Sequence, residues 1–315
     1  MLSIVIPVYN EEESLPSLYS ELQEVLSSLN IQYEIIFIND GSTDKSLSVL
    51  KEIYSKDSSH IRIIDLRRNF GQTAALLAGF QHARGDLVLS LDADGQNDPH
   101  DIPLLLNTLT EEIDVICGWR YPRHDPFFRK ILPSRVSNFL NRKINNLDIH
   151  DSGCTLRLYR IEAVKNLSLM RGEHRYIPAI LSHQGFNISE VKVNHRPRVK
   201  GKSKYGFNRL FSGFFDLFMI KLLSNYNQKP IRLFAKIGFL FLITAFSLGT
   251  YLLIVKYALG QDIGDRPLLL LTLLLGLSGF QFLLSGFMTE LIVRHTSYVN
   301  NPSTDITYHI KKIYE

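Results

Sequence analysis

The sequence has little cysteine and little net charge, and each scarcity excludes a class of protein. Its 315 residues contain two cysteines, Cys117 and Cys154, and one disulfide cannot stabilise a domain of this size. We therefore expect the folded portion to face a reducing compartment. The net charge of +4 is too small to indicate a nucleic-acid partner. A hydrophobic content of 45% excludes a disordered or collagen-like chain, so one large domain with an addition is expected.

The N-terminus lacks the features of a signal peptide. The first residues, MLSIVIP, contain neither a basic region nor a small-residue cleavage site. We expect no signal peptide and a strand that begins at once.

Two long stretches near the C-terminus carry no charge, although the mean hydropathy of the chain is zero. Ile237 to Val255 would reach roughly 28 Å as a helix, about one hydrocarbon thickness. Pro267 to Thr289 is a second such stretch, with glycines for close helix contact at Gly276, Gly279 and Gly286. Buried helices of a soluble core are the alternative. We favour a transmembrane hairpin, whose glycine-bearing faces would permit a homo-oligomer.

The charges around these stretches predict the orientation of the hairpin. Four basic residues precede the first stretch, whereas the bases of the short connection are balanced by Asp262 and Asp265. The positive-inside rule then places both termini in the cytosol. An interfacial helix at 207–223, or alternatively a core helix, would precede the first span. The expected units are a cytosolic catalytic domain at 1–206, juxtamembrane amphipathic helices at 207–236, a hairpin at 237–289 (spans 237–255 and 267–289) and a cytosolic tail at 290–315.

The N-terminal two thirds alternate between strand-like and helix-like segments. Short runs rich in isoleucine, valine or leucine predict strands at 3–8, 33–39, 61–66, 86–91 and 114–117. Apolar residues at helical spacing predict helices at 15–29, 45–54, 73–82 and 102–109. This alternation predicts an α/β fold with a mostly parallel sheet covered by helices on both faces. In such sheets ligands bind beyond the carboxyl ends of the strands.

Polar residues stand at the ends of the first two predicted strands. Tyr9, Asn10 and Glu11 follow the first strand, and Asp40 with Gly41 follows the second. A carboxylate in this position can accept hydrogen bonds from a ribose or a base, while Gly41 allows a sharp turn. The alternative is a simple turn followed by a helix N-cap.

Two carboxylates, Asp92 and Asp94, directly follow the fourth apolar run. Hard oxygen ligands of this kind suit Mg²⁺ or Mn²⁺, which would neutralise a departing diphosphate. A solvated acidic turn is the alternative, but the position at a strand end favours a metal site.

Basic residues collect further along the chain and indicate an anionic phosphate partner. Lipid headgroups or a solvated loop are alternatives for the later cluster, because it directly precedes the interfacial segment. The basic residues are Arg120, Arg123, Arg129, Lys130, Arg135, Arg196, Arg198, Lys200, Lys202 and Lys204.

Taken in order, these motifs resemble family-2 inverting glycosyltransferases with a GT-A fold. Essentially the whole chain looks like the polyprenyl-phosphate group, which includes dolichyl-phosphate mannosyltransferases and bacterial bactoprenol glucosyltransferases; the hairpin looks most like the latter. The motifs are Ile6-Pro7-Val8-Tyr9-Asn10-Glu11, Asn39-Asp40-Gly41-Ser42, Asp92-Ala93-Asp94-Gly95-Gln96, Asp151-Ser152-Gly153, and Arg198 followed by Gly201, Ser203 and Lys204.

The resemblance implies roles for individual residues. Asp151 would act as a catalytic base or as a group that orients the acceptor, beside Asp94. Asn39 departs from the second aspartate of many relatives, so its side chain carries no implied role. The nucleotide would be bound by Pro7, Tyr9, Glu11 and Asp40, the metal by Asp92, Asp94 and Gln96, and phosphates of donor or acceptor by Arg120, Arg135, Arg198, Ser203 and Lys204.

The implied activity is transfer of one sugar, glucose from UDP-glucose in the first instance, to a polyprenyl phosphate such as undecaprenyl phosphate. The enzyme would lie in a bacterial inner membrane with its active site on the cytosolic face. GDP-mannose or a UDP-amino-arabinose-type donor is the alternative. A processive polysaccharide synthase is disfavoured, because the sole tryptophan, Trp119, lies outside a Gln-x-x-Arg-Trp motif. A non-catalytic membrane scaffold is a further alternative, against which Asp92, Asp94 and Gln96 argue.

Overall fold

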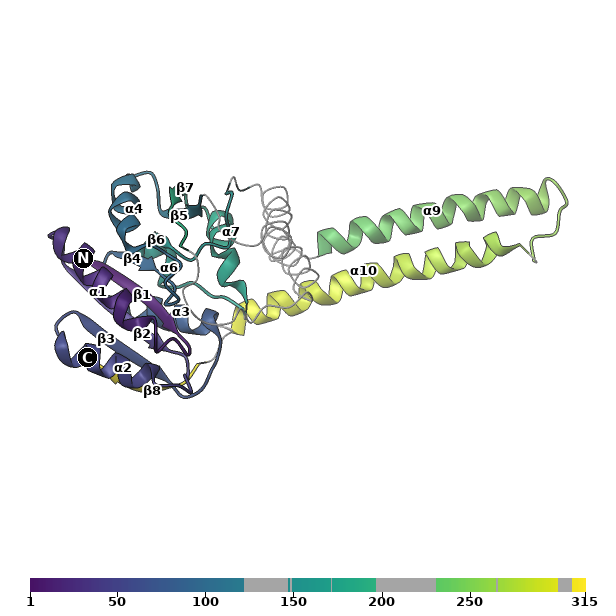
Figure 1. Cartoon of the computed structure of the whole chain (residues 1–315). Coiled ribbons are helices and arrows are strands. Elements are labelled where there is room, and N and C mark those ends of the chain that lie inside the picture. The colour runs from purple at the N-terminus through teal and green to yellow at the C-terminus, as the bar shows by residue number, and fades with distance from the viewer. Residues whose placement is uncertain (122–146, 148, 171, 197–230, 265, 300–307) are drawn as a thin grey trace. The chain divides into compact units, whose positions relative to one another are not determined.

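The computed structural model describes residues 1–121, 147, 149–170, 172–196, 231–264, 266–299 and 308–315, with side chains in the second long helix described as far as residue 293 (Figure 1). The chain forms two compact units. The first contains the described residues up to 196 together with 308–315, and the second contains two long helices.

The first unit is built on an eight-stranded sheet with the order β7-β5-β6-β4-β1-β2-β3-β8. Among the described strands β1–β2, β1–β4, β2–β3 and β5–β7 pair in parallel, whereas β4–β6, β5–β6 and β3–β8 are antiparallel. The strands are β1 (Leu2–Val8), β2 (Tyr33–Asn39), β3 (Ile61–Leu66), β4 (Leu87–Ser90), β5 (Val115–Arg120), β6 (Arg157–Arg160), β7 (Ile188–Val193) and β8 (Ile310–Tyr314).

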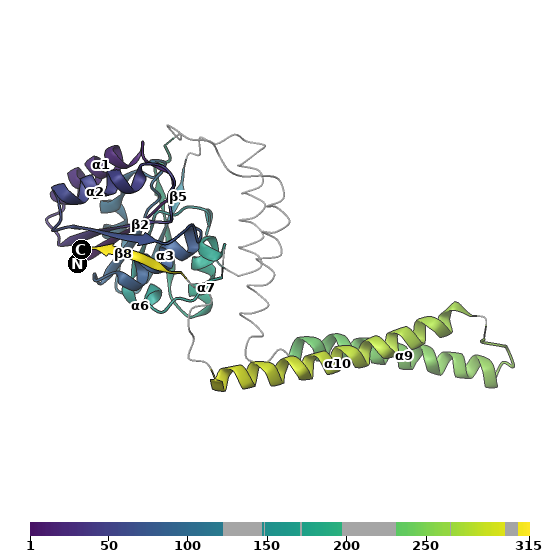
Figure 2. The same cartoon turned by 90° about the horizontal axis from the view of Figure 1, so that it is seen from below.

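Helices cover both faces of this sheet, as Figures 1 and 2 show. The strand and helix predictions for residues 1–117 are confirmed within a few residues at each end. The helices of the first unit are α1 (Leu15–Ser28), α2 (Ser46–Lys56), α3 (Gln72–His82), η1 (Pro99–Asp101), α4 (Ile102–Thr108), α6 (Ile161–Val164), η3 (Glu173–Tyr176) and α7 (Ile177–His183).

The two faces of the sheet carry separate hydrophobic clusters. Side chains from α1, α2 and α4 pack with one face, and those from α3, α6 and α7 pack with the other. Helix α3 approaches the sheet closely because it is rich in small residues; a Cβ atom on Gly79 would lie 2.2 Å from Val5 Cγ1. Burial on both faces explains why β1 and β2 are continuous apolar runs. The predicted mostly parallel α/β architecture is therefore confirmed.

The last residues of the chain form an edge of this sheet. Strand β8 pairs with β3 in antiparallel register, with Tyr314 opposite Ile63 and Ile310 opposite Leu66. The Glu315 carboxylate accepts hydrogen bonds from Arg62 and Arg84, each at 2.8 Å. The segment predicted only as a tail thus covers the polar backbone edge of β3.

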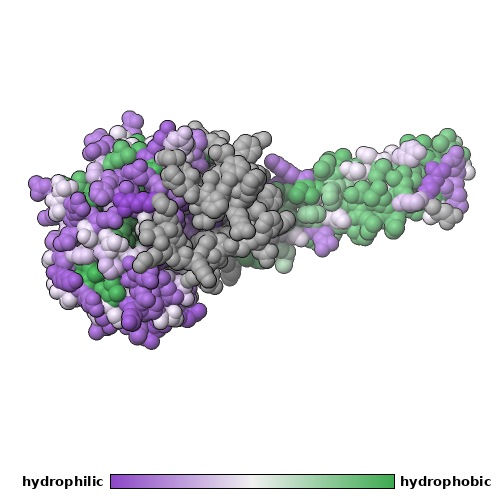
Figure 3. Space-filling view, viewed as in Figure 1, coloured by the Kyte–Doolittle hydropathy of each residue, from purple (hydrophilic) through white to green (hydrophobic). Residues whose placement is uncertain are grey.

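The second unit is a hairpin of α9 (Ile231–Tyr257) and α10 (Pro267–Val299). Both helices are long and apolar enough to cross a membrane, and their apolar side chains are mostly exposed (Figure 3). A buried soluble core would hide these side chains, so the exposure favours the membrane prediction.

Glycines allow the two hairpin helices to pack closely. A Cβ atom on Gly279 would lie 2.9 Å from the carbonyl oxygen of Gly238, and one on Gly286 would lie 2.7 Å from Phe234 Cβ. These positions fit the expectation of close helix contact. Because the glycines are used between α9 and α10, they do not by themselves indicate an oligomer.

Candidate active site

The loops after β1 and β2 are joined by hydrogen bonds between side chains and backbone. Asn10, which has a left-handed φ of 57°, accepts a hydrogen bond from the Thr43 amide at 2.8 Å. The Glu11 amide donates to Ser46 Oγ at 2.9 Å. These contacts hold the half-buried Tyr9 and Glu11 at the carboxyl edge of the sheet, and Pro7 lies within β1 opposite Ile38.

Asp40 ties this edge to the loop that precedes α3. Its buried carboxylate accepts hydrogen bonds from the Phe70 amide at 2.7 Å and the Gly71 amide at 2.9 Å. Gly41 has a φ of 63°, and a Cβ atom there would lie 2.4 Å from the carbonyl carbon of Arg68. Only glycine therefore fits this close approach. Asp40 has a defined structural contact, and its role toward a nucleotide stays a prediction.

Asn39 also has structural partners. Its amide nitrogen donates to Asp65 at 2.7 Å, and its amide oxygen accepts from the Ser42 amide at 3.3 Å. These contacts between neighbouring strands and the following turn account for an uncharged residue at this position.

Asp92 and Asp94 lie in the turn after β4, at the same edge. Asp92 Oδ1 accepts a hydrogen bond from Gln72 Nε2 at 2.8 Å, so the first turn of α3 orients it. Burial and the neighbouring Asp94 carboxylate raise the pKa of Asp92 to about 6. The Gln96 backbone amide donates to Asp94 Oδ1 at 3.1 Å, which places Gln96 in the same turn. Two carboxylates that repel each other, in one turn with Gln96, form a set of oxygen donors that suits a divalent cation.

Arg120 and Asp151 form a two-point ion pair near this turn. Arg120 Nε lies 2.7 Å from Asp151 Oδ2, and Arg120 Nη2 lies 2.9 Å from Asp151 Oδ1. The Asp151 side chain is only 2% exposed, so this pair is strongly shielded from water. The structure thus brings together the predicted phosphate-binding arginine and the predicted base. Their roles stay predictions.

Glu190 on β7 holds the turn that presents Asp151. Its carboxylate accepts from the backbone amides of His150 and Asp151, each at 2.9 Å, and contacts His150 Nδ1 at 2.8 Å. The His150 ring stacks on Trp119 with 4.3 Å between centroids. Sequence reasoning missed Glu190, because nothing in the pattern of β7 shows which turn its side chain reaches.

Arg157, at the start of β6, is buried and binds main-chain carbonyls. It donates to the carbonyl oxygen of Ser152 at 2.6 Å and to that of His174 at 3.0 Å. A buried guanidinium with carbonyl partners fixes the segment after Asp151 against η3. The sequence analysis also missed this residue and Gln72. No local signal indicated either residue, because β6 was not predicted and the contact of Gln72 depends on how α3 packs against the sheet.

Four predicted phosphate-binding residues, Arg135, Arg198, Ser203 and Lys204, lie outside the described residues. Arg196, just before the undescribed segment, contacts the turn that contains Asp94, since its amide donates to the carbonyl oxygen of Gln96 at 3.0 Å.

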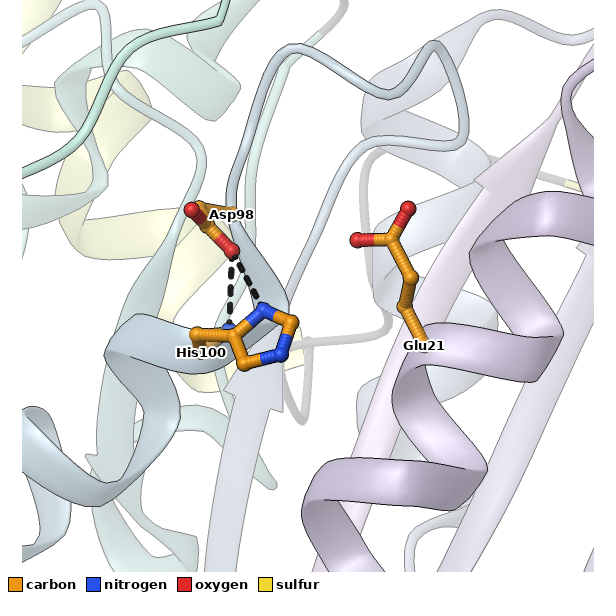
Figure 4. Close-up of side chains that lie close together, drawn as sticks. All are labelled: Glu21, Asp98 and His100. Atoms are coloured by element: carbon orange, nitrogen blue, oxygen red, sulfur yellow. Dashed lines mark hydrogen bonds and ion pairs between the residues drawn. The ribbon is translucent and has the colours of Figure 1, made fainter.

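A second acidic cluster lies nearby and is neutralised by an arginine. Figure 4 shows Glu21 from α1 facing Asp98 and His100, whose ligand atoms lie within 4.8 Å of one another. Arg196 pairs with both Glu21 and Asp98, at 2.6 Å each. The guanidinium supplies the positive charge that these acids require, so we assign no metal to this cluster.

Comparison with known proteins identifies the family. Residues 3–168, which contain most of the site just described, match glycosyl transferase family 2. The chain belongs to this family. The glycosyltransferase is 37% identical over 317 residues to dodecaprenyl-phosphate galacturonate synthase of Rhizobium johnstonii, covering 100% of this chain and 93% of the relative. It is 36% identical over 299 residues to undecaprenyl-phosphate 4-deoxy-4-formamido-L-arabinose transferase of Pseudomonas fluorescens, covering 95% and 86%.

Solved structures share the fold of this glycosyltransferase. Glucosyl-3-phosphoglycerate synthase from Mycobacterium tuberculosis, in complex with phosphoglyceric acid, matches with a TM-score of 0.53 at 16% identity, covering 71% of this chain and 79% of that chain. The same enzyme with Mn²⁺, uridine diphosphate and phosphoglyceric acid matches with a TM-score of 0.52 at 17% identity, covering 71% and 78%. The GT-A fold and the resemblance to polyprenyl-phosphate glycosyltransferases are therefore confirmed.

Proposed function

We propose that this glycosyltransferase moves one sugar from a UDP-sugar to the phosphate of a membrane polyprenol. The observation that carries the proposal is the whole-length similarity to a relative named for dodecaprenyl phosphate, which extends through the hairpin. A polyprenol of this kind stays in the bilayer, so an enzyme that acts on it must work at the membrane surface. The exposed apolar hairpin meets that requirement.

A divalent cation, Mg²⁺ or Mn²⁺, fits the turn after β4. The donor set would be Asp92, Asp94 and Gln96, all of which offer the oxygen ligands that these ions prefer. The raised pKa of Asp92, caused first by burial and then by Asp94, supports this fit because a bound cation would stabilise both carboxylates in their charged forms. When bound, such an ion would supply charge neutralisation for the departing diphosphate.

The protein side chains would then bring together two anions, the acceptor phosphate and the diphosphate of the donor. An acceptor phosphate monoester has a second pKa near 6 and is already largely ionised at neutral pH. Its attack at the anomeric carbon, with inversion, therefore needs orientation and charge neutralisation more than a base. Arg120 would supply positive charge, and Asp151 would hold the Arg120 guanidinium in place through its two contacts.

The pairing of β3 with β8 bears on the membrane topology. Ile63 and Tyr314 lie opposite each other in one sheet, so they are on the same side of any membrane. The chain between them must cross an even number of times, as a hairpin does. The basic residues before the apolar stretch 237–255 favour the cytosol as that side, in a bacterial inner membrane.

The identity of the sugar is tested by a transfer assay. The full chain, reconstituted in lipid with undecaprenyl phosphate and Mg²⁺ or Mn²⁺, would receive radiolabelled UDP-glucose, UDP-galacturonate, a UDP-4-formamido-arabinose or GDP-mannose. Label moving into the lipid phase from one UDP-sugar supports the proposal and names the sugar. Glucose is the donor expected from the sequence, whereas the two relatives above are named for other sugars. Nucleotide binding without transfer would overturn the acceptor assignment.

A further inference from the structure

The C-terminal strand has two ends with different surroundings. At the end of β8, Glu315 pairs with Arg62 and Arg84, beside the beginning of β3. At the start of β8, the carbonyl oxygen of His309 accepts from the Arg67 amide at 2.9 Å, directly after β3. The start of β8 therefore lies at the carboxyl edge of the sheet, where the candidate active site is built.

His309 contacts the loop that joins β3 to α3. The His309 and Phe70 rings meet edge to face with 6.1 Å between centroids. The Arg68 guanidinium lies over the same Phe70 ring, 4.5 Å from its centroid. Phe70 is thus held between an arginine of its own loop and a residue more than two hundred positions away in sequence.

The same loop connects directly to two predicted binding residues. The Phe70 and Gly71 amides donate to the two oxygens of Asp40. Gln72, the next residue, donates to Asp92. The loop 67–71 and the first residue of α3, Gln72, therefore link the C-terminal strand to both the predicted nucleotide site and the predicted metal site.

We propose that the C-terminal strand is a positioning element for donor binding, and that His309 acts through Phe70 as a positioning residue. Arg67 and Arg68 are exposed, so contacts with β8 and Asp40, rather than burial, order this part of the loop. The ring contact restricts Phe70 and thereby keeps the amides of Phe70 and Gly71 directed at Asp40. Ordering the loop before the donor arrives removes part of the entropy cost of binding. The donor class, a UDP-sugar with a divalent cation, rests on the proposed function.

Two variants at opposite ends of β8 test this role in the full-length chain. His309→Ala removes the ring beside Phe70, whereas Glu315→Gln removes the ion pairs at the far end and serves as the matched control. Calorimetry with UDP and Mn²⁺ should show affinity about twofold to fivefold weaker for His309→Ala, the scale of one exposed aromatic contact. Glu315→Gln should leave the affinity unchanged even if it lowers the melting temperature. His309→Phe should restore wild-type affinity, because it keeps a ring in place.

Amide hydrogen exchange gives a readout that does not depend on any ligand. His309→Ala should speed exchange at Phe70 and Gly71, and Glu315→Gln should not. In a Phe70→Ala background, His309→Ala should have no further effect on either measurement. The inference would be overturned if His309→Ala and Glu315→Gln changed exchange at these amides equally. It would also be overturned if His309→Ala did not change exchange at these amides. If exchange changes as expected but no sugar is transferred, only the proposed function is contradicted.

Discussion

Asp151 uses both carboxylate oxygens to hold one guanidinium, and this geometry distinguishes two possible roles. A catalytic base must present an oxygen to the reacting group, whereas an orienting group can be fully engaged with its partner. The contacts of 2.7 and 2.9 Å to Arg120 favour orientation. A weaker contact, with Arg160 Nε 3.8 Å from Asp114 Oδ1, offers a comparison within the same chain.

We expect Asp151→Asn to lower kcat about tenfold without changing the pH dependence of transfer. An amide cannot accept both guanidinium hydrogen bonds, so Arg120 would lose its fixed orientation. Loss of a true base would instead cost about a hundredfold or more and alter the pH profile. Asp114→Asn, which weakens the pair with Arg160 away from the site, should leave kcat unchanged. Steady-state kinetics across pH decide between the two outcomes.

The carboxylates after β4 allow a second test at single residues. Asp94→Asn should reduce metal-dependent transfer by about a hundredfold or more, because a neutral amide binds a divalent cation weakly. The folded state should persist, since Asp94 lies in a turn and is only half-buried. The measurement is the transfer rate as a function of Mn²⁺ concentration, together with thermal unfolding.

Asp98→Asn is the control for that experiment. Asp98 belongs to the neighbouring acidic cluster, in which Arg196 already supplies the positive charge. The Mn²⁺ dependence of transfer should therefore stay as in the wild type. A shift of the Mn²⁺ dependence in Asp98→Asn, with none in Asp94→Asn, would move the metal site to the cluster of Figure 4.

Residues that end a strand could be predicted from the sequence, but their partners could not. Asp92 and Asp94 stand out because two carboxylates follow an apolar run. The hydrogen bond from Gln72 to Asp92 depends on how α3 packs against the sheet, and the contact of Glu190 with Asp151 depends on strand register. Neither contact can be predicted from the local sequence pattern, because each joins segments that are distant in sequence.

At the scale of elements, the predictable strands are those buried on both faces. Strands β1, β2 and β3 are apolar runs whose type and length the sequence predicts well. Strand β6 (Arg157–Arg160) escapes prediction because its arginines are satisfied by carbonyls rather than by solvent. Strand β8 contains two lysines in five residues and pairs along one edge only, so it resembles a polar tail.

The turn after β2 gives a stability prediction for the elements that it joins. Gly41→Ala should lower the free energy of unfolding by more than about 2 kcal/mol, since it combines a left-handed φ with overlap against the backbone of residues 68 and 69. Gly185→Ala is the matched control, because Gly185 has a φ of 96° but open space around it. It should cost about 1 kcal/mol. Denaturant unfolding of the first unit, within the full chain, measures the loss of unfolding free energy in both variants. Equal losses would contradict the close approach of Gly41 to the backbone of residues 68 and 69.

At the scale of the whole molecule, the hairpin prediction can be tested by labelling. The native cysteines, Cys117 and Cys154, are buried, so an introduced cysteine can be labelled selectively. We expect Gln261→Cys, between α9 and α10, to react with a membrane-impermeant maleimide in intact cells. Ser58→Cys, in the first unit, should react only after lysis. Labelling of both from the same side would contradict a hairpin that crosses the membrane twice.

The order of synthesis gives the β3–β8 pairing a further consequence. Strand β3 is made before both helices of the hairpin, whereas its edge partner β8 is made after them. The β3 edge therefore stays open while the intervening helices are synthesised and handled by the membrane machinery. An open β3 edge marks a chain that has not completed this step, which makes it a recognisable signal for chaperones or proteases.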